Sequence, residues 1–208
     1  MQARMIFYDR LRSEFFPRLT ALGFIGDEKT YRRIRGEIVS MVTLREHRGG
    51  DRCCIELAMH LGFLPASWSR HSLNTEKLTA ADCEFQWRLN PSRKHDYWWY
   101  YRRWFQSPVR CAGHLIRTFR DRGEALFDRH QSVEDFAGLF SPEDFTTGDW
   151  LKAPHGIKPQ RGALTMARIH LQLGRLEEAR AFARAGLGLI SPTTGLAAEY
   201  HNILKRSD

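Results

Sequence analysis

Apolar side chains recur every three or four positions near the start of the chain, which is the spacing of an amphipathic helix. The stripe consists of Phe7, Leu11, Phe15, Leu19 and Leu22. Pro17 lies inside the pattern and should kink the helix or begin its final turns. Gly23 follows the last apolar position, where glycine is a natural stop. The pattern predicts a helix over residues 3–22.

Beyond residue 24 the spacing changes to the alternation of β-strands, with turn residues between the alternating segments. Gly36 separates the first two segments, and the turn sequence at residues 48–51 (RGGD) favours a hairpin between the second and the third. We therefore expect a four-stranded antiparallel meander. Its strands are predicted at residues 30–35, 37–47, 52–62 and 83–89.

Alternation also assigns each side chain to one face of this sheet. The apolar face should pack against the N-terminal helix. It carries Cys53, Ile55, Leu57, Met59, Leu61, Cys83, Phe85, Trp87 and Leu89. The opposite face is expected to be open and partly polar. It carries Glu56, His60, Glu84, Gln86 and Arg88. The predicted fold class is α+β, a meander covered by an N-terminal helix and followed by a helical C-terminal region.

Helical spacing returns at residues 109–129, and Ser132 with Asp135 indicates the start of a short capped helix that ends near Phe140. Residues 141–160 hold three of the eight prolines, which favours a linker or an Ω-like connection. The predicted organisation is an α+β domain at 1–140, a linker at 141–160 and a helical unit at 161–208.

The last segment resembles a single tetratricopeptide-type helical hairpin followed by a terminal helix. Small residues, a turn glycine and a final proline stand at Ala163, Ala167, Leu173, Gly174, Ala179, Ala183 and Pro192. One repeat cannot bury its own apolar face. The hairpin must therefore dock on the main domain, on a third helix at about 195–205, or on another subunit.

Composition indicates a folded protein with a basic surface. Hydrophobic residues make up 42% of the chain, enough for a packed core. The net charge is +8, which invites a nucleic-acid interpretation, but acidic residues are interleaved with the basic ones nearly everywhere. We expect a cytoplasmic protein, because the N-terminus lacks the pattern of a secretory signal and no segment has the length of a membrane span. The four cysteines are then expected to be free, buried thiols.

Several weak motifs occur in an order that resembles the bacterial family called domain of unknown function 4304, over about residues 1–140. The matching pieces are Leu22-Gly23-Phe24, Tyr31-Arg32-Arg33, Leu61-Gly62, the segment 83–88, the pair Trp98-Trp99 and the later SVEDF sequence. The resemblance implies an α+β domain in which the tryptophan pair is a packing feature. It brings no established catalytic residues, and residues 161–208 lie outside it.

Signals for chemistry are weak. The sequence has neither the tight ligand pairs of a zinc site nor a phosphate-binding glycine loop, so we predict no metal and no cofactor. Glu56, His60 and Glu84 share the polar sheet face, where a histidine near carboxylates can act as a general base. The same three residues can instead be explained without catalysis, as members of cross-strand charged pairs on a sheet face in contact with solvent.

The segment HDYWWYYRRWF at residues 95–105 concentrates aromatic rings and arginines. Single-strand binders use such groups as a cationic stacking platform. However, consecutive rings cannot all face one way; in a helical turn Tyr97, Tyr101 and Trp104 would share one face. At least half of the rings should be buried, with Trp98 and Trp99 closing the core. The candidate contact residues at the far end are Tyr101, Arg102, Arg103 and Trp104.

Three functions remain open. The first is a non-enzymatic protein-binding or regulatory module of a bacterial cytoplasm, with the polar sheet face and the C-terminal hairpin as recognition surfaces. The second is nucleic-acid binding through the basic aromatic region 87–122. The third is an enzyme with a Glu/His site on the open sheet face. The candidate binding residues are Glu56, His60, Glu84, Arg88, Tyr101, Arg102, Arg103 and Trp104.

Overall fold

A computed structural model describes residues 2–65, 78–92, 97–102, 107–149, 158–191 and 194–206. The predicted N-terminal helix forms as α1 (Gln2–Arg10), a π-helical turn (Leu11–Phe15) and α2 (Phe16–Ala21). Pro17, which has no N–H to donate, lies in the first turn after the π segment, and the helix continues through it. Gly23, at φ +83°, ends the helix, because Phe24 N–H donates to Leu19 O at 3.0 Å.

The predicted antiparallel meander is confirmed, and two short strands extend it. The strands are β1 (Ile25–Gly26), β2 (Thr30–Arg35), β3 (Ile38–Glu46), β4 (Arg52–Leu61) and β5 (Phe85–Arg88), paired in that order. A sixth strand, β6 (Trp99–Tyr100), pairs with Arg52 and Cys53 of β4, beyond the end of β5. It was not predicted, and it places the aromatic segment beside the β3–β4 hairpin.

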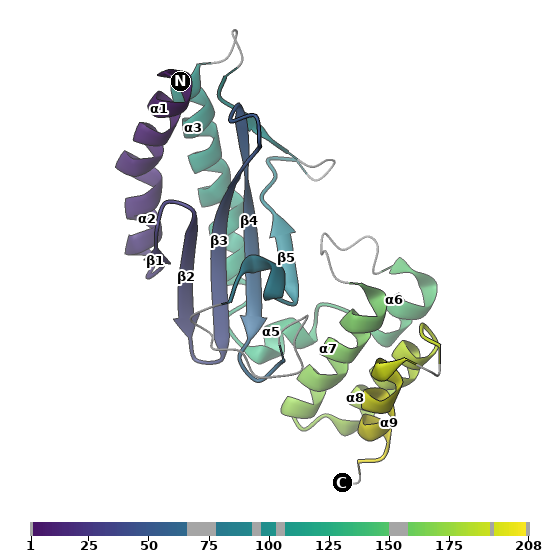
Figure 1. Ribbon diagram of the computed structural model, residues 1–208. Coiled ribbons are helices and arrows are strands. Elements are labelled where there is room, and N and C mark those ends of the chain that lie inside the picture. Colours follow the sequence, from purple (N-terminus) through teal and green to yellow (C-terminus); the bar gives the residue numbers. More distant parts are fainter. Residues whose placement is uncertain are drawn as a thin grey trace.

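One face of the sheet is covered by two helices that lie side by side (Figure 1). The first is α1–α2. The second is α3 (Pro108–Thr118), which continues through a π-helical turn (Phe119–Gly123) into α4 (Glu124–Asp128). The π turns of the two helices meet where the rings of Phe15 and Phe119 pack edge to face at 5.1 Å, and an ion pair joins Arg18 to Glu124. The apolar face predicted for β4 packs into this core.

The opposite face is not open along its whole length. A second, small core consists of Val39, Met41, Ala58, Leu78 and Cys83. Cys83 was predicted on the helix-covered face, but β5 begins only at Phe85, after a 3-10 turn (Ala80–Asp82), so strand alternation does not apply to it. His60 and Glu84, which were predicted on this open face, are buried as well, at 2% and 6% exposed. The prediction of an open face is therefore wrong at this end of the sheet.

Two short helices follow α4, each begun by a reciprocal capping box. Ser132 and Asp135 cap α5 (Val133–Ala137), as predicted. Ser141 and Asp144 cap α6 (Pro142–Thr147), which forms inside the segment predicted as a linker. Residues 150–157 of that segment lie outside the described part of the chain.

The C-terminal unit consists of α7 (Pro159–Gln172), α8 (Leu176–Leu187) and α9 (Gly195–Leu204). Helices α7 and α8 form a hairpin at Gly174, whose φ is +71°. Helix α9 packs on α8 where Tyr200 covers Gly186, and α6 packs on the hairpin through Phe145 and Phe182, whose rings are 6.0 Å apart. The hairpin therefore docks on its own chain, and its buried residues belong to the same core as the sheet. The predicted tetratricopeptide proline, Pro192, is not described.

No helix within the described ranges has both the length and the apolar character needed to cross a membrane.

Candidate functional site

The described part of the aromatic segment, residues 97–102, alternates as a strand and not as a helical turn. The backbone N–H groups of Tyr101 and Arg102 donate to Asp51 O, which continues the pairing of β6 beyond Tyr100. Trp99 and Tyr101 consequently face the helix-covered core and are 1% and 0% exposed. Trp98, on the other side, is half-buried and does not belong to that core. The prediction of a core position is confirmed for Trp99 and is wrong for Trp98.

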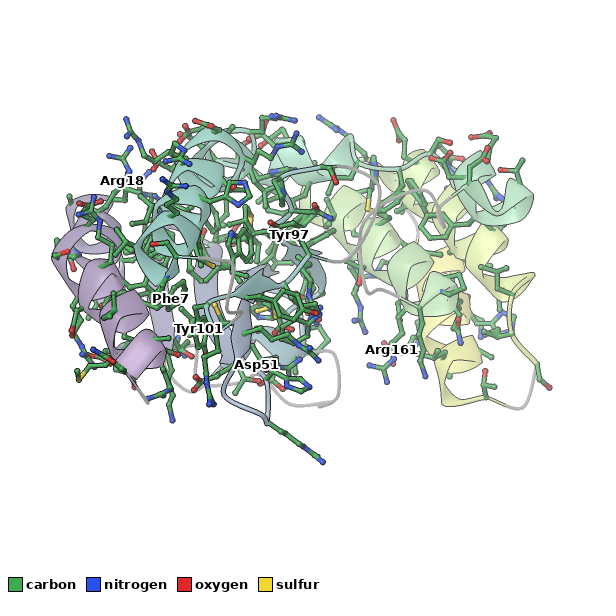
Figure 2. All side chains as sticks on the ribbon, turned by 90° about the horizontal axis from the view of Figure 1, so that it is seen from above. Phe7, Arg18, Asp51, Tyr97, Tyr101 and Arg161 are labelled. Carbon is green, nitrogen blue, oxygen red and sulfur yellow. The ribbon has the colours of Figure 1, made fainter. Side chains whose placement is uncertain are left out.

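Tyr101 does not reach the surface, so it is corrected from a contact residue to a core residue. Its ring stacks on Phe7 with centroids 4.4 Å apart, between α1 and the sheet (Figure 2). Its hydroxyl donates to Glu46, which also accepts two hydrogen bonds from Arg4 at 2.6 and 2.9 Å. These bonds from Arg4 hold the pKa of the Glu46 carboxyl below its usual range.

The outward side of β6 forms part of a cluster that we call the Trp98 patch, made of Trp98, Tyr100, His47, Arg52 and Arg88. The guanidinium groups of Arg52 and Arg88 lie over the Trp98 ring, 5.3 and 5.1 Å from its centroid. Arg52 also lies 5.0 Å from the Tyr100 centroid and donates to the Tyr100 oxygen at 3.2 Å and to His47 Nε2 at 2.9 Å. The patch lies on the sheet face opposite α1 and α3.

Glu56 and Arg88 form the cross-strand charged pair that alternation suggested. They are directly opposite each other on β4 and β5, with Arg88 Nη2 3.4 Å from Glu56 Oε1. Arg45 of β3 donates to the same oxygen at 2.8 Å. One carboxylate therefore bridges two guanidinium groups at the border of the Trp98 patch.

His60 and Glu84 come together, but away from Glu56. His60 Nδ1 and Glu84 Oε2 are 2.6 Å apart, and burial raises the pKa of Glu84. Glu56 lies four positions along β4 from His60, about 13 Å at strand spacing. The three residues do not form one site; His60 and Glu84 are a buried pair, and Glu56 belongs with the arginines.

The basic aromatic region 87–122 is divided between the two sides of the sheet. Arg88 belongs to the Trp98 patch, whereas the exposed arginines Arg110, Arg117 and Arg120 lie on the helix that covers the opposite face. Arg102 is exposed next to the β3–β4 hairpin. The candidates Arg103 and Trp104 lie outside the described residues.

Sequence reasoning omitted His47, Arg52 and Trp98 from the candidates. The alternation that placed Glu56 on the polar face also places Arg52 there, because Arg52 lies four residues before Glu56 on β4. His47 closes the hairpin opposite Arg52, where its N–H donates to Arg52 O. Both could have been found by extending the face assignment to the strand ends.

The four cysteines are free and buried, as expected. Burial raises the pKa of Cys111 to about 12, which keeps it a thiol at neutral pH. Across the parts of the chain that are described, no group of three or more His, Cys, Asp or Glu side chains gathers as metal ligands would.

The resemblance seen in the motifs agrees with a family comparison. Residues 15–111 match the model of the family described as Domain of unknown function (DUF4304). The match runs from the end of the first π turn to the start of α3, so it includes every strand of the sheet and the Trp98 patch. It supports the predicted domain over residues 15–111, and the family's description states no function. Searches of the curated proteins and of the solved structures found no match to the chain.

Proposed function

We propose that the protein is a non-enzymatic, protein-binding or regulatory module of a bacterial cytoplasm, and that the Trp98 patch is its binding surface. The observation that carries the proposal is the pair of guanidinium groups over the half-buried Trp98 ring, on the sheet face that the helices do not cover. Tryptophan, tyrosine and arginine are the residues that most often supply binding energy at protein interfaces.

The C-terminal hairpin has the small-residue pattern of a tetratricopeptide repeat, but its geometry favours a structural role. In a repeat array, neighbouring repeats cover both flanks of each hairpin. Here α9 packs on α8, α5 packs on α7, and α6 packs on both α7 and α8. Since these helices occupy the flanks, the hairpin is a weaker candidate for the recognition surface than the Trp98 patch.

Nucleic-acid binding is less well supported than protein binding. Single-strand binders stack bases on exposed aromatic faces. Trp99 and Tyr101 are buried in the core, and the Trp98 ring already has the guanidinium groups of Arg52 and Arg88 over it. A base would have to displace these arginines in order to stack on Trp98.

Affinity capture from a lysate of the source organism tests the proposal. The bait proteins are the wild type, the double variant Arg52→Gln/Arg88→Gln, and Arg120→Gln, which removes a positive charge from the helix layer on the other side of the sheet. We expect a protein that the wild type and Arg120→Gln recover at equal yield and the double variant loses. Recovery of the same proteins by all three baits would contradict the patch as the binding surface.

A further inference from the structure

The surroundings of the Trp98 patch carry an excess of positive charge. The β3–β4 hairpin and the strands beside it contribute the five guanidinium groups of Arg45, Arg48, Arg52, Arg88 and Arg102. Among the described residues, the carboxylates that form ion pairs with them include Asp51, next to Arg52, and Glu56, between Arg45 and Arg88. Arg45 is 61% exposed at its side chain, so much of this charge faces solvent. A surface of this sign attracts an acidic partner and repels a basic one.

Arg52 is held in a fixed orientation before any partner binds. It lies over two rings, donates to His47 and Tyr100, and has a side chain that is only 26% exposed. A guanidinium is planar and matches the two oxygens of a carboxylate. Since its side chain is already ordered, less conformational entropy is lost when a carboxylate binds.

The protein itself shows that this surface accepts a carboxylate. Glu56 lies on the border of the patch and bridges Arg45 and Arg88 through one oxygen. An incoming carboxylate would bind the same arginines, so Glu56 is its internal competitor. Removing the negative charge of Glu56 should then strengthen binding, an effect that a loss of folding cannot produce.

We propose that the Trp98 patch binds an acidic segment of a partner protein, with Asp or Glu carboxylates at Arg45, Arg52 and Arg88. This inference rests on the proposed function and adds the chemical class of the partner. Because the arginines cover the ring of Trp98, carboxylates fit this surface better than stacked bases do.

Fluorescence anisotropy at low ionic strength tests the proposal with three labelled probes. The first is a peptide of alternating glutamate and serine, the second replaces every glutamate with glutamine, and the third is a thymidine oligonucleotide of equal charge. We expect the glutamate peptide to bind, the glutamine peptide not to bind, and the oligonucleotide to bind no more tightly than the glutamate peptide.

Variants locate the site. Arg52→Gln and Arg88→Gln should each weaken binding of the glutamate peptide about two- to fivefold, the range of a partly exposed ion pair. Glu56→Gln should strengthen it by a similar factor, and Arg120→Gln, the matched control on the other side of the sheet, should leave it unchanged. Equal weakening by Arg120→Gln would show that net charge alone binds the peptide and would overturn the proposal.

Two further results separate this inference from the proposed function. If only the oligonucleotide binds, and the patch variants abolish that binding, the partner class is wrong and nucleic acid takes its place. If no probe binds while a captured protein still depends on Arg52 and Arg88, the acidic chemistry is wrong but the protein-binding function stands.

Discussion

Replacing Tyr101 with phenylalanine removes one hydroxyl and leaves its stacked ring in place. The ring is fully buried against Phe7, and a phenylalanine ring fills the same space. The variant therefore tests one interaction, the hydrogen bond from the Tyr101 hydroxyl to the Glu46 carboxylate. It also tests whether the aromatic segment is a strand, because only a strand places Tyr101 and Tyr100 on opposite faces.

The expected loss in the free energy of unfolding follows from the charge of Glu46 and from the partners that Glu46 keeps in the variant. A hydrogen bond to a charged group contributes about 1.5–3 kcal/mol. Glu46 keeps its two bonds from Arg4 at 2.6 and 2.9 Å, and its side chain is 26% exposed. The lower part of the range therefore applies, about 1.5–2 kcal/mol. For a chain of this length, that lowers Tm by about 3–8 °C.

Thermal unfolding followed by circular dichroism measures this loss, and Tyr100→Phe is the control on the same strand. Its hydroxyl lies on the half-exposed face, where it accepts a hydrogen bond from Arg52 at 3.2 Å. Its partner is charged too, but the bond is at the long end of the hydrogen-bond range and the half-buried Tyr100 position lets water take the place of the hydroxyl, so the expected loss is below about 1 kcal/mol. If the two variants lose equal stability, or if Tyr100→Phe loses more, then the assignment of faces along β6 is wrong.

Three other properties can be checked. Burial lowers the pKa of His170, so the imidazole is protonated in the unfolded chain at a higher pH than in the folded protein. The free energy of unfolding should therefore fall as pH drops below about 6.5, by up to about 1.4 kcal/mol per pH unit. Urea unfolding of wild type and of His170→Phe across this pH range measures the part of the loss that His170 causes. Gly186→Ala places a methyl group 2.2 Å from the Tyr200 ring and should cost about 1–3 kcal/mol in thermal unfolding, whereas Gly113→Ala, in the interior of α3, should gain about 0.4–1 kcal/mol. The four buried thiols should react with Ellman's reagent only after denaturation; rapid reaction of the native protein would contradict their burial.

The parts of the fold with a strong local period were predictable from the sequence. The N-terminal stripe and the alternation of β4 each fix which side chains are buried, because one face must meet the core. Helix α6 was missed although Ser141 and Asp144 repeat the capping signal of Ser132 and Asp135. The prolines and glycines nearby favoured a linker, but Pro142 occupies the first turn of α6, where proline is compatible with a helix.

The candidate site depends on long-range pairing, which local sequence does not encode. The strand character of Trp99 and Tyr100 comes from β4, and Trp98 meets Arg52 and Arg88 because β4 pairs with both β6 and β5. Only the pairing of these three strands brings the two arginines to one ring. The sequence analysis considered a helical turn for the aromatic rings, whereas pairing with β4 selects a short strand.

Because β6 is a strand, the aromatic segment divides two roles between alternating residues. Trp99 and Tyr101 face the core that α1 and α3 cover, so changes there act on stability. Trp98 and Tyr100 face the arginines on the other side, so changes there act on the patch. If the patch binds a partner, binding and stability can be altered separately within four consecutive residues. That separation is a property of strand alternation, and a helical turn with the same composition would not provide it.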